Sequence, residues 1–164
     1  MKITGNADES FKQSMLDFPS FLDRTGRSRF GDSIIQVLVV THASVEKNAD
    51  EPLKTEGKVI CELVVTEDML NGEGNVHGGC SAYLIDMCST LVLMACGHYV
   101  HVSQSLNVVY HSPATLGEKL RIVNTTMTIG RRTMTARTEI WNATKHRLVA
   151  SGVHIKMVPS PSKL

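Results

Sequence analysis

The sequence predicts an α+β domain in which an antiparallel sheet wraps around one long central helix. The first observation is an apolar stretch from Cys80 to Cys96 that follows a glycine-rich loop. A helix that is apolar nearly all round has to be buried, and a sheet is the element that can cover it. The second observation is that segments with the two-residue periodicity of strands lie on both sides of this stretch.

Three elements are expected before the central helix. Apolar side chains at helical spacing predict a short amphipathic helix over residues 8–18, and Pro19 is expected to end it. Residues 33–45 are rich in β-branched side chains and predict a first strand. Residues 57–66 alternate between apolar and polar side chains and predict a second strand.

Four more strands are expected after the helix, for which Gly97 is a suitable end. They cover residues 100–111, 119–129, 132–142 and 147–157. Turn-forming residues separate the last three, with Gly130 in one turn and Asn142 at the start of the next. The expected order is therefore two strands, a buried helix and an antiparallel meander.

The 164 residues suffice for one domain with a sizeable core. We expect an N-terminal helical extension over residues 1–32, the main domain over residues 33–158, and a solvated tail over residues 159–164. No internal repeat divides the chain further.

The composition excludes several classes of protein. Hydrophobic residues make up 42% of the chain, charged residues make up 20%, and the net charge is +1. These values are ordinary for a soluble globular protein. The near-neutral charge does not indicate binding to nucleic acid or to a membrane surface. The apolar stretch is interrupted by Asp86 and falls short of a membrane span, so we interpret it as a core helix. Residues 1–8 lack the apolar core of a secretory signal.

The cysteines predict free thiols in a reducing compartment. Cys80, Cys88 and Cys96 follow each other at intervals of eight residues, about 12 Å along a helix, which is too far for a disulfide. No metal site is expected, because His77 and Cys80 lie at one end of that helix whereas His98 and His101 lie at the other.

One carboxylate stands out within the apolar stretch. Asp86 is the only charged side chain between His77 and His98, and an ionised group is costly to bury without a purpose. The preceding Gly78-Gly79 pair allows close approach to the unpaired N–H groups of the helix start. This combination suggests a site for a developing negative charge, although a carboxylate paired for structural reasons is the alternative.

At this point the residues resemble a known family. The motif formed by Asn71, His77-Gly78-Gly79 and Asp86 resembles the acyl-CoA thioesterases of the PaaI-like and thioesterase-superfamily-member type, which have the hotdog fold. The resemblance covers roughly residues 55–157. It includes residues 57–62, 102–103, 110–114 and 116–118.

The resemblance implies a catalytic role for five residues. Asp86 is the candidate base or nucleophile, and the Gly78 N–H would bind the thioester oxygen. Asn71 would bind the carbonyl or position a water, His77 would hold the loop, and Ser103 would position the attacking water. Without the resemblance, a loop Asn or His is more often a turn or cap residue, and a strand Ser is usually inert.

A second set of residues is expected to bind the coenzyme A part of the substrate. Arg131 and Arg132 at a hairpin tip suit a phosphate, although a solvated turn is an equal alternative. Lys156 is a weaker candidate for the same role. The substrate-binding set comprises Gly79, Tyr110, His111, Ser112, Pro113, Ala114, Thr115, Gly130, Arg131 and Arg132. No separate cofactor is expected, since coenzyme A belongs to the substrate.

The spacing of the motif bears on the assembly. Gly78 and Asp86 lie eight residues apart, roughly 12 Å along one helix, so they are too far apart to act on one carbonyl. The resemblance implies that the site forms between two subunits, with Asp86 from one and the glycine loop from the other. We therefore expect a homodimer, with pairing of dimers into a tetramer.

The chain ends in Ser162-Lys163-Leu164, the address that the peroxisomal import receptor reads. The sequence thus predicts a peroxisomal acyl-CoA thioesterase that releases a fatty acid and coenzyme A, and a cytoplasmic one if the tail is coincidental. Two alternatives are a hotdog enoyl-CoA hydratase or dehydratase, and a non-catalytic acyl-CoA-binding protein.

Overall fold

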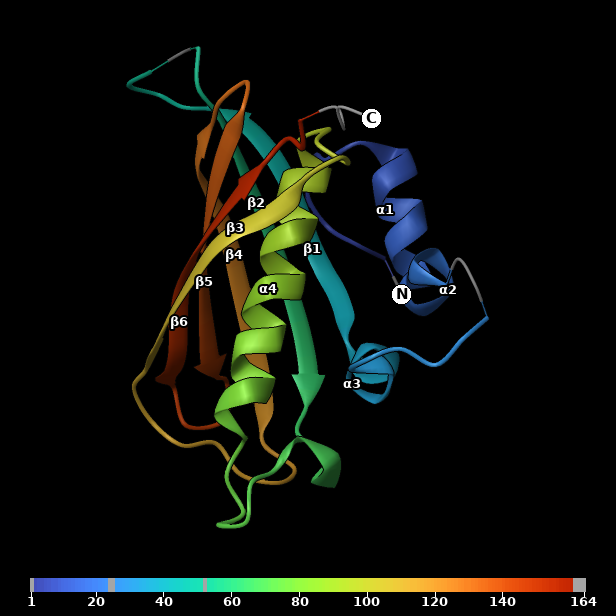
Figure 1. Ribbon diagram of the computed structural model, residues 1–164, viewed down its shortest axis with the longest axis vertical. Helices are drawn as coiled ribbons and strands as arrows, with labels where there is room; N and C mark the ends of the chain where they lie inside the picture. The colour runs from blue at the N-terminus through green and yellow to red at the C-terminus, as the bar shows by residue number, and fades with distance from the viewer. Residues whose placement is uncertain (1, 24–25, 52, 161–164) are drawn as a thin grey trace.

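The computed structural model describes residues 2–23, 26–51 and 53–160, and Figure 1 shows one sheet with a long helix lying across it. The six strands are antiparallel and run in the order β1-β2-β4-β5-β6-β3. Their bounds are β1 Val39–Lys47, β2 Thr55–Val64, β3 Val102–Tyr110, β4 Lys119–Ile129, β5 Thr133–Asn142 and β6 Arg147–Met157. The helix is α4, Gly78–Ala95. The predicted α+β hotdog architecture is confirmed.

The meander is shorter than the sequence suggested. Strands β4, β5 and β6 follow each other as hairpin neighbours, but β3 crosses over and pairs with β6 at the edge of the sheet. The predicted meander of four strands was wrong on this point, because strand periodicity fixes the face of each side chain but not its neighbouring strand. This topology leaves one edge of β3 without a partner strand in the described chain.

Helix α4 is a core helix that the sheet covers on one side. Eleven of its side chains are buried, including Leu84, Cys88 and Val92, so its length and apolar composition belong to a protein core. His77 caps its first turn, since His77 Nδ1 accepts a hydrogen bond of 2.8 Å from the Gly79 N–H. Asp86 and Met87 lie on the side that the sheet leaves only partly covered.

The N-terminal helices begin and end differently from the prediction. Helix α1 spans Glu9–Leu16, and helix α2, Phe18–Leu22, follows it directly. Pro19 does not end a helix here. It lies in the first turn of α2, where a missing N–H costs nothing, and the Asp17 carboxylate caps that turn by accepting from the Ser20 N–H.

The predicted strand over residues 33–45 was wrong in its first part. Residues Asp32–Val37 form helix α3, and the strand begins at Val39. Consecutive Ile34 and Ile35 are both buried, which a helix at the edge of the core allows and a strand with one covered face does not. Burial of both side chains therefore outweighs the preference of β-branched residues for strands.

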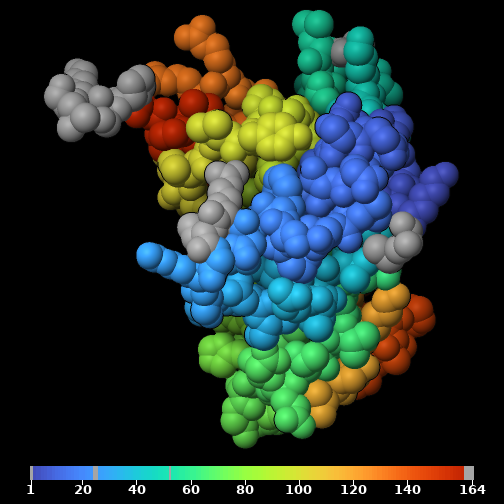
Figure 2. Space-filling view, turned by 90° about the vertical axis from the view of Figure 1, so that its right-hand side faces the viewer, coloured from blue at the N-terminus to red at the C-terminus, as the bar shows by residue number. Residues whose placement is uncertain are grey.

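The N-terminal segment covers the β1 side of the sheet, as Figures 1 and 2 show. Thr4 pairs with β1 in parallel and therefore protects an otherwise open sheet edge. Phe11, Met15 and Phe18 are buried against the core. The extension is thus part of the packed domain, and its last helix crosses the boundary expected after residue 32.

Candidate active site

Asp86 lies near the middle of α4 with 47% of its side chain exposed. Its Oδ1 atom is 3.7 Å from Lys156 Nζ and 3.5 Å from His154 Nδ1, and both of those residues project from β6 toward the helix. The Asp86 side chain is therefore open to solvent on one side and faces a buried polar cluster on the other. An exposed carboxylate with these neighbours is available for chemistry.

His154 forms the floor of this cluster and is buried, at 1% exposure. Its Nδ1 lies 2.7 Å from Ser89 Oγ, and the Ser89 hydroxyl donates in turn to the Asp86 carbonyl oxygen. Because the Ser89 hydroxyl uses its proton in that bond, its oxygen can only accept a hydrogen bond from His154. The imidazole proton is therefore assigned to Nδ1. Burial, reinforced by the Lys156 charge and opposed by Asp86, lowers the His154 pKa to about 4. The imidazole is therefore neutral near pH 7.

Lys156 is equally enclosed, with 7% of its side chain exposed. Its ammonium donates to Ser103 Oγ at 3.3 Å, and Ser103 lies on the edge strand β3. Burial lowers the pKa of Lys156, and the Asp86 carboxylate opposes that shift. Lys156 was suggested as a phosphate ligand; in this structure its ammonium is enclosed and lies between the Asp86 carboxylate and the Ser103 hydroxyl.

The glycine-rich loop before α4 forms the second group of candidate residues. The Asn71 side-chain oxygen accepts from the N–H groups of Glu73 and Asn75, which leaves its NH2 group as the donor available to a ligand. The first N–H groups of a helix have no acceptor within it. His77 takes up the Gly79 N–H, which leaves the Gly78 N–H at the helix start as the candidate donor to a ligand.

The structure brings this loop together with the segment that follows β3. Asn75 pairs with Thr115, the Val76 N–H donates to the Ala114 carbonyl at 2.8 Å, and the Tyr110 hydroxyl donates to the Gly78 carbonyl at 3.1 Å. A cavity of about 370 Å³ lies between the two segments. Its lining comprises Asn75, Val76, Gly78, Ser81, Tyr110, His111, Ser112, Pro113, Ala114 and Val149.

A buried carboxylate fixes the geometry of this segment. Glu118 accepts from the Thr115 N–H at 2.9 Å and from the Asn142 side-chain NH2 at 2.6 Å, and it pairs with Lys145. The Lys145 hydrogen bond is the main reason that the Glu118 pKa lies below its usual range. Neither Glu118 nor Asn142 was expected to have a role in the site.

Other predicted residues lie apart within one chain. Gly130, Arg131 and Arg132 are exposed at the β4–β5 hairpin tip. Figure 1 places this tip at the end of the sheet opposite to the loop that precedes α4. Gly78 and Asp86 are likewise separated by two turns of α4. One subunit therefore does not assemble all the predicted residues around one point.

The sequence reasoning missed His154 as a neighbour of Asp86. A signal was present, because alternation along β6 puts Ala150, Gly152, His154 and Lys156 on the face that packs against the helix. Two basic residues on a buried face have to find partners. Which partners they find depends on the register of β6 against α4, which the sequence does not contain.

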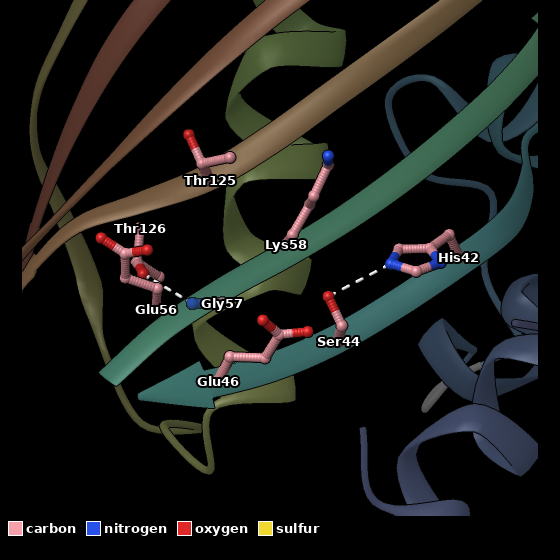
Figure 3. A pocket seen from close by; sticks show the side chains of 8 residues that line it. All are labelled: His42, Ser44, Glu46, Glu56, Gly57, Lys58, Thr125 and Thr126. Atoms are coloured by element: carbon pink, nitrogen blue, oxygen red, sulfur yellow. Dashed lines mark hydrogen bonds between the residues drawn. The ribbon is translucent and has the colours of Figure 1, made fainter. Parts of the chain in front are cut away.

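A separate cavity lies across strands β1, β2 and β4, away from these residues. Figure 3 shows its lining, in which the His42 and Ser44 side chains lie 3.1 Å apart and the Gly57 N–H donates to Thr126 Oγ1. Burial, followed by the Lys58 charge, lowers the His42 pKa. None of the residues expected to act on a thioester lines this cavity.

Comparison with known proteins gives the class of the fold and site. Residues 73–149 match the thioesterase superfamily. Human acyl-coenzyme A thioesterase 13 is 37% identical over 101 residues, which cover 61% of this chain and 72% of that protein. The chain therefore belongs to the thioesterase superfamily.

Solved structures agree with this assignment. Zebrafish thioesterase superfamily member 2 superposes with a TM-score of 0.73 at 28% identity, over 91% of this chain and 98% of that one. A Streptococcus mutans protein bound to acetyl CoA superposes with a TM-score of 0.59 at 26% identity, over 65% of this chain and 84% of that one.

The buried imidazole predicts a loss of stability in mild acid. The folded-state pKa of His154 lies below the unfolded value of 6.5, so its contribution is complete above about pH 6.5 and is lost as the pH falls toward 4. The expected loss is up to about 3 kcal/mol. Urea unfolding between pH 4 and 7 measures it, and a His154→Gln variant should show a flatter dependence. An equally steep dependence in the variant would contradict the assignment.

Proposed function

We propose that this protein hydrolyses acyl-CoA thioesters to a free fatty acid and coenzyme A. The observation that carries the proposal is a carboxylate on the open side of α4, Asp86, in a chain whose helix start also presents the Gly78 N–H. Membership of the thioesterase superfamily and the names of its relatives support the same chemistry.

The loop before α4 supplies the stabilisation of negative charge. The Gly78 N–H lies at the positive end of the helix dipole and donates to the thioester oxygen as it becomes an oxyanion. The Asn71 NH2 group is the second donor, since its oxygen is already bound within the loop. His77 keeps both in place by capping the helix.

Asp86 provides the carboxylate that starts the attack on the thioester. As a general base, its carboxylate takes a proton from a water whose oxygen attacks the carbonyl carbon, and the tetrahedral intermediate expels the thiolate. Ser103 helps to hold this water. Direct attack by Asp86 through an acyl anhydride is the other route open to the same carboxylate. A thiolate is a weak base, so neither route needs a strong acid for the leaving group.

The site is completed by a second subunit. Strand β3 is an unpaired edge with exposed apolar side chains, among them Val102, Leu106 and Val109. A long apolar edge strand is a template for pairing with another chain. Pairing of two β3 strands about a two-fold axis places α4 beside its copy, so that Asp86 of one subunit approaches the Gly78 loop of the other. Two such dimers then associate into a tetramer.

The same arrangement accounts for the residues assigned to coenzyme A. Antiparallel pairing brings the hairpin tip of one subunit to the end of the sheet that carries Tyr110–Thr115 in the other. The cavity beside Gly78 and Tyr110 then holds the pantetheine arm, with Gly79 and residues 111–115 along its wall. Arg131 and Arg132 carry the charge for the phosphates.

We also propose that the reaction belongs to the peroxisome and to fatty acid metabolism. The support is the tripeptide Ser162-Lys163-Leu164, which matches the address that the import receptor reads. These three residues lie outside the described residues.

Removal of the base tests the reaction. Asp86→Asn keeps the shape of the side chain but removes the group that accepts the proton, so thiol release from acyl-CoA should fall by about 10²–10⁴-fold. The matched control is Asp50→Asn, an exposed carboxylate in the β1–β2 loop, which should retain full activity. Hydrolysis at the wild-type rate in Asp86→Asn would exclude the mechanism, and binding of acyl-CoA without thiol release by the wild type would favour a carrier.

Complementation tests the shared site. Gly78→Pro removes one N–H at the first helical position, which tolerates proline, and this variant and Asp86→Asn should each be inactive. Their heterodimer, isolated with two different tags, has one site with both groups intact and should recover about half of the wild-type rate. A heterodimer as inactive as its parents would place the site within one subunit, and failure to form any dimer would contradict the assembly.

The location is tested with the full chain carrying a fluorescent protein at its N-terminus. Fluorescence should coincide with a peroxisomal marker and become diffuse when Ser162–Leu164 are deleted, because the import receptor needs the free tripeptide. An unchanged distribution after the deletion would contradict the assignment.

A further inference from the structure

Lys156 connects two residues that come from different elements of the candidate site. Its ammonium lies 3.7 Å from the Asp86 carboxylate on α4 and donates to the Ser103 hydroxyl on β3 at 3.3 Å. Lys156 itself projects from β6, between those two elements. We propose that Lys156 is a positioning residue of the hydrolytic site, which fixes the orientation of the Asp86 carboxylate and holds Ser103 beside it. The inference rests on the proposed thioester hydrolysis.

The burial of Lys156 gives the first argument. Only 7% of its side chain is exposed, against 47% for Asp86. An ammonium is rarely enclosed to this degree unless a carboxylate compensates for the lost hydration, and Asp86 is the carboxylate within 4 Å. The pair is therefore asymmetric, since the cation is buried while the anion remains open to a water and a substrate.

The second argument comes from the groups that surround Asp86. From β6 it faces His154 and Lys156, and Tyr83 lies three residues earlier on its own helix. His101, before β3, interacts electrostatically with Lys156. Burial raises the Tyr83 pKa to about 12 and lowers the pKa values of both histidines, so these three groups are neutral near pH 7. Lys156 is thus the charged group that faces the Asp86 carboxylate among the described residues.

The contact with Ser103 gives the third argument. A hydroxyl that accepts a hydrogen bond from an ammonium keeps its own proton free to donate. The exposed Ser103 hydroxyl can therefore direct its proton to a water that lies beside Asp86. Loss of Lys156 would remove both effects, since neither the Asp86 carboxylate nor the Ser103 hydroxyl would keep its fixed orientation.

The decisive measurement separates kcat from KM for thiol release. In Lys156→Met the Asp86 carboxylate and the Ser103 hydroxyl lose the ammonium that lies between them, so kcat should fall about tenfold with little change in KM. Lys156→Arg keeps a cationic donor and should restore most of kcat.

The control is Lys58→Met, an exposed lysine on β2 that should leave kcat and KM unchanged. An unchanged kcat in Lys156→Met would overturn the proposal, and so would a rise in KM alone, which indicates a substrate contact. Thermal melting verifies that each variant folds. If the methionine variant does not fold, Lys156→Gln is judged by the same two constants and the same criteria.

The outcome is distinguishable from a failure of the proposed function. That failure would appear as wild-type protein without thiol release, or as full activity in Asp86→Asn. Failure of the present proposal would leave Asp86 essential and the kcat of Lys156→Met equal to that of the wild type.

Discussion

The close packing of α4 against the sheet is the constraint on which the rest of the structure depends. At Gly152 an added Cβ would lie 2.8 Å from Ile85 Cγ2 on the helix, and at Gly57 it would lie 2.5 Å from Cys96 Sγ. Such distances leave no room for a side chain. Because the sheet approaches the helix this closely on one side, the opposite side of the helix is left more open. Asp86 lies at the margin between the two sides, where it meets His154 and Lys156 of β6.

The polar groups of the site gather where the sheet stops covering the helix. His154 and Lys156 belong to the buried face of β6, yet their polar ends reach the margin of that face, where Asp86 and Ser89 meet them. Buried polar groups cost stability unless they are paired. Their presence at this margin therefore argues for a role in the chemistry, because an apolar pair of similar volume would pack there at least as well.

Much of the site and fold was predictable, and the errors share one cause. The long helix, the strands from residue 119 onward and the conspicuous carboxylate follow from periodicity and from the rarity of charge in an apolar stretch. Helix α3 and the place of β3 were missed because local preference does not report which surfaces a segment will bury. Lys156 was interpreted as a candidate for binding a phosphate for the same reason, since its neighbour Asp86 lies seventy residues away in the sequence.

By itself, the sequence determined that this chain buries one apolar helix under an antiparallel sheet. It also determined that a single carboxylate follows a glycine-rich helix start by eight residues. Those features are local, because periodicity and spacing act along the chain. Only the tertiary structure decided that Asp86 meets His154 and Lys156, and that the loop of Gly78 meets Tyr110. These contacts depend on strand order and on the register of β6 and β3 against α4, which the packing of the whole core sets.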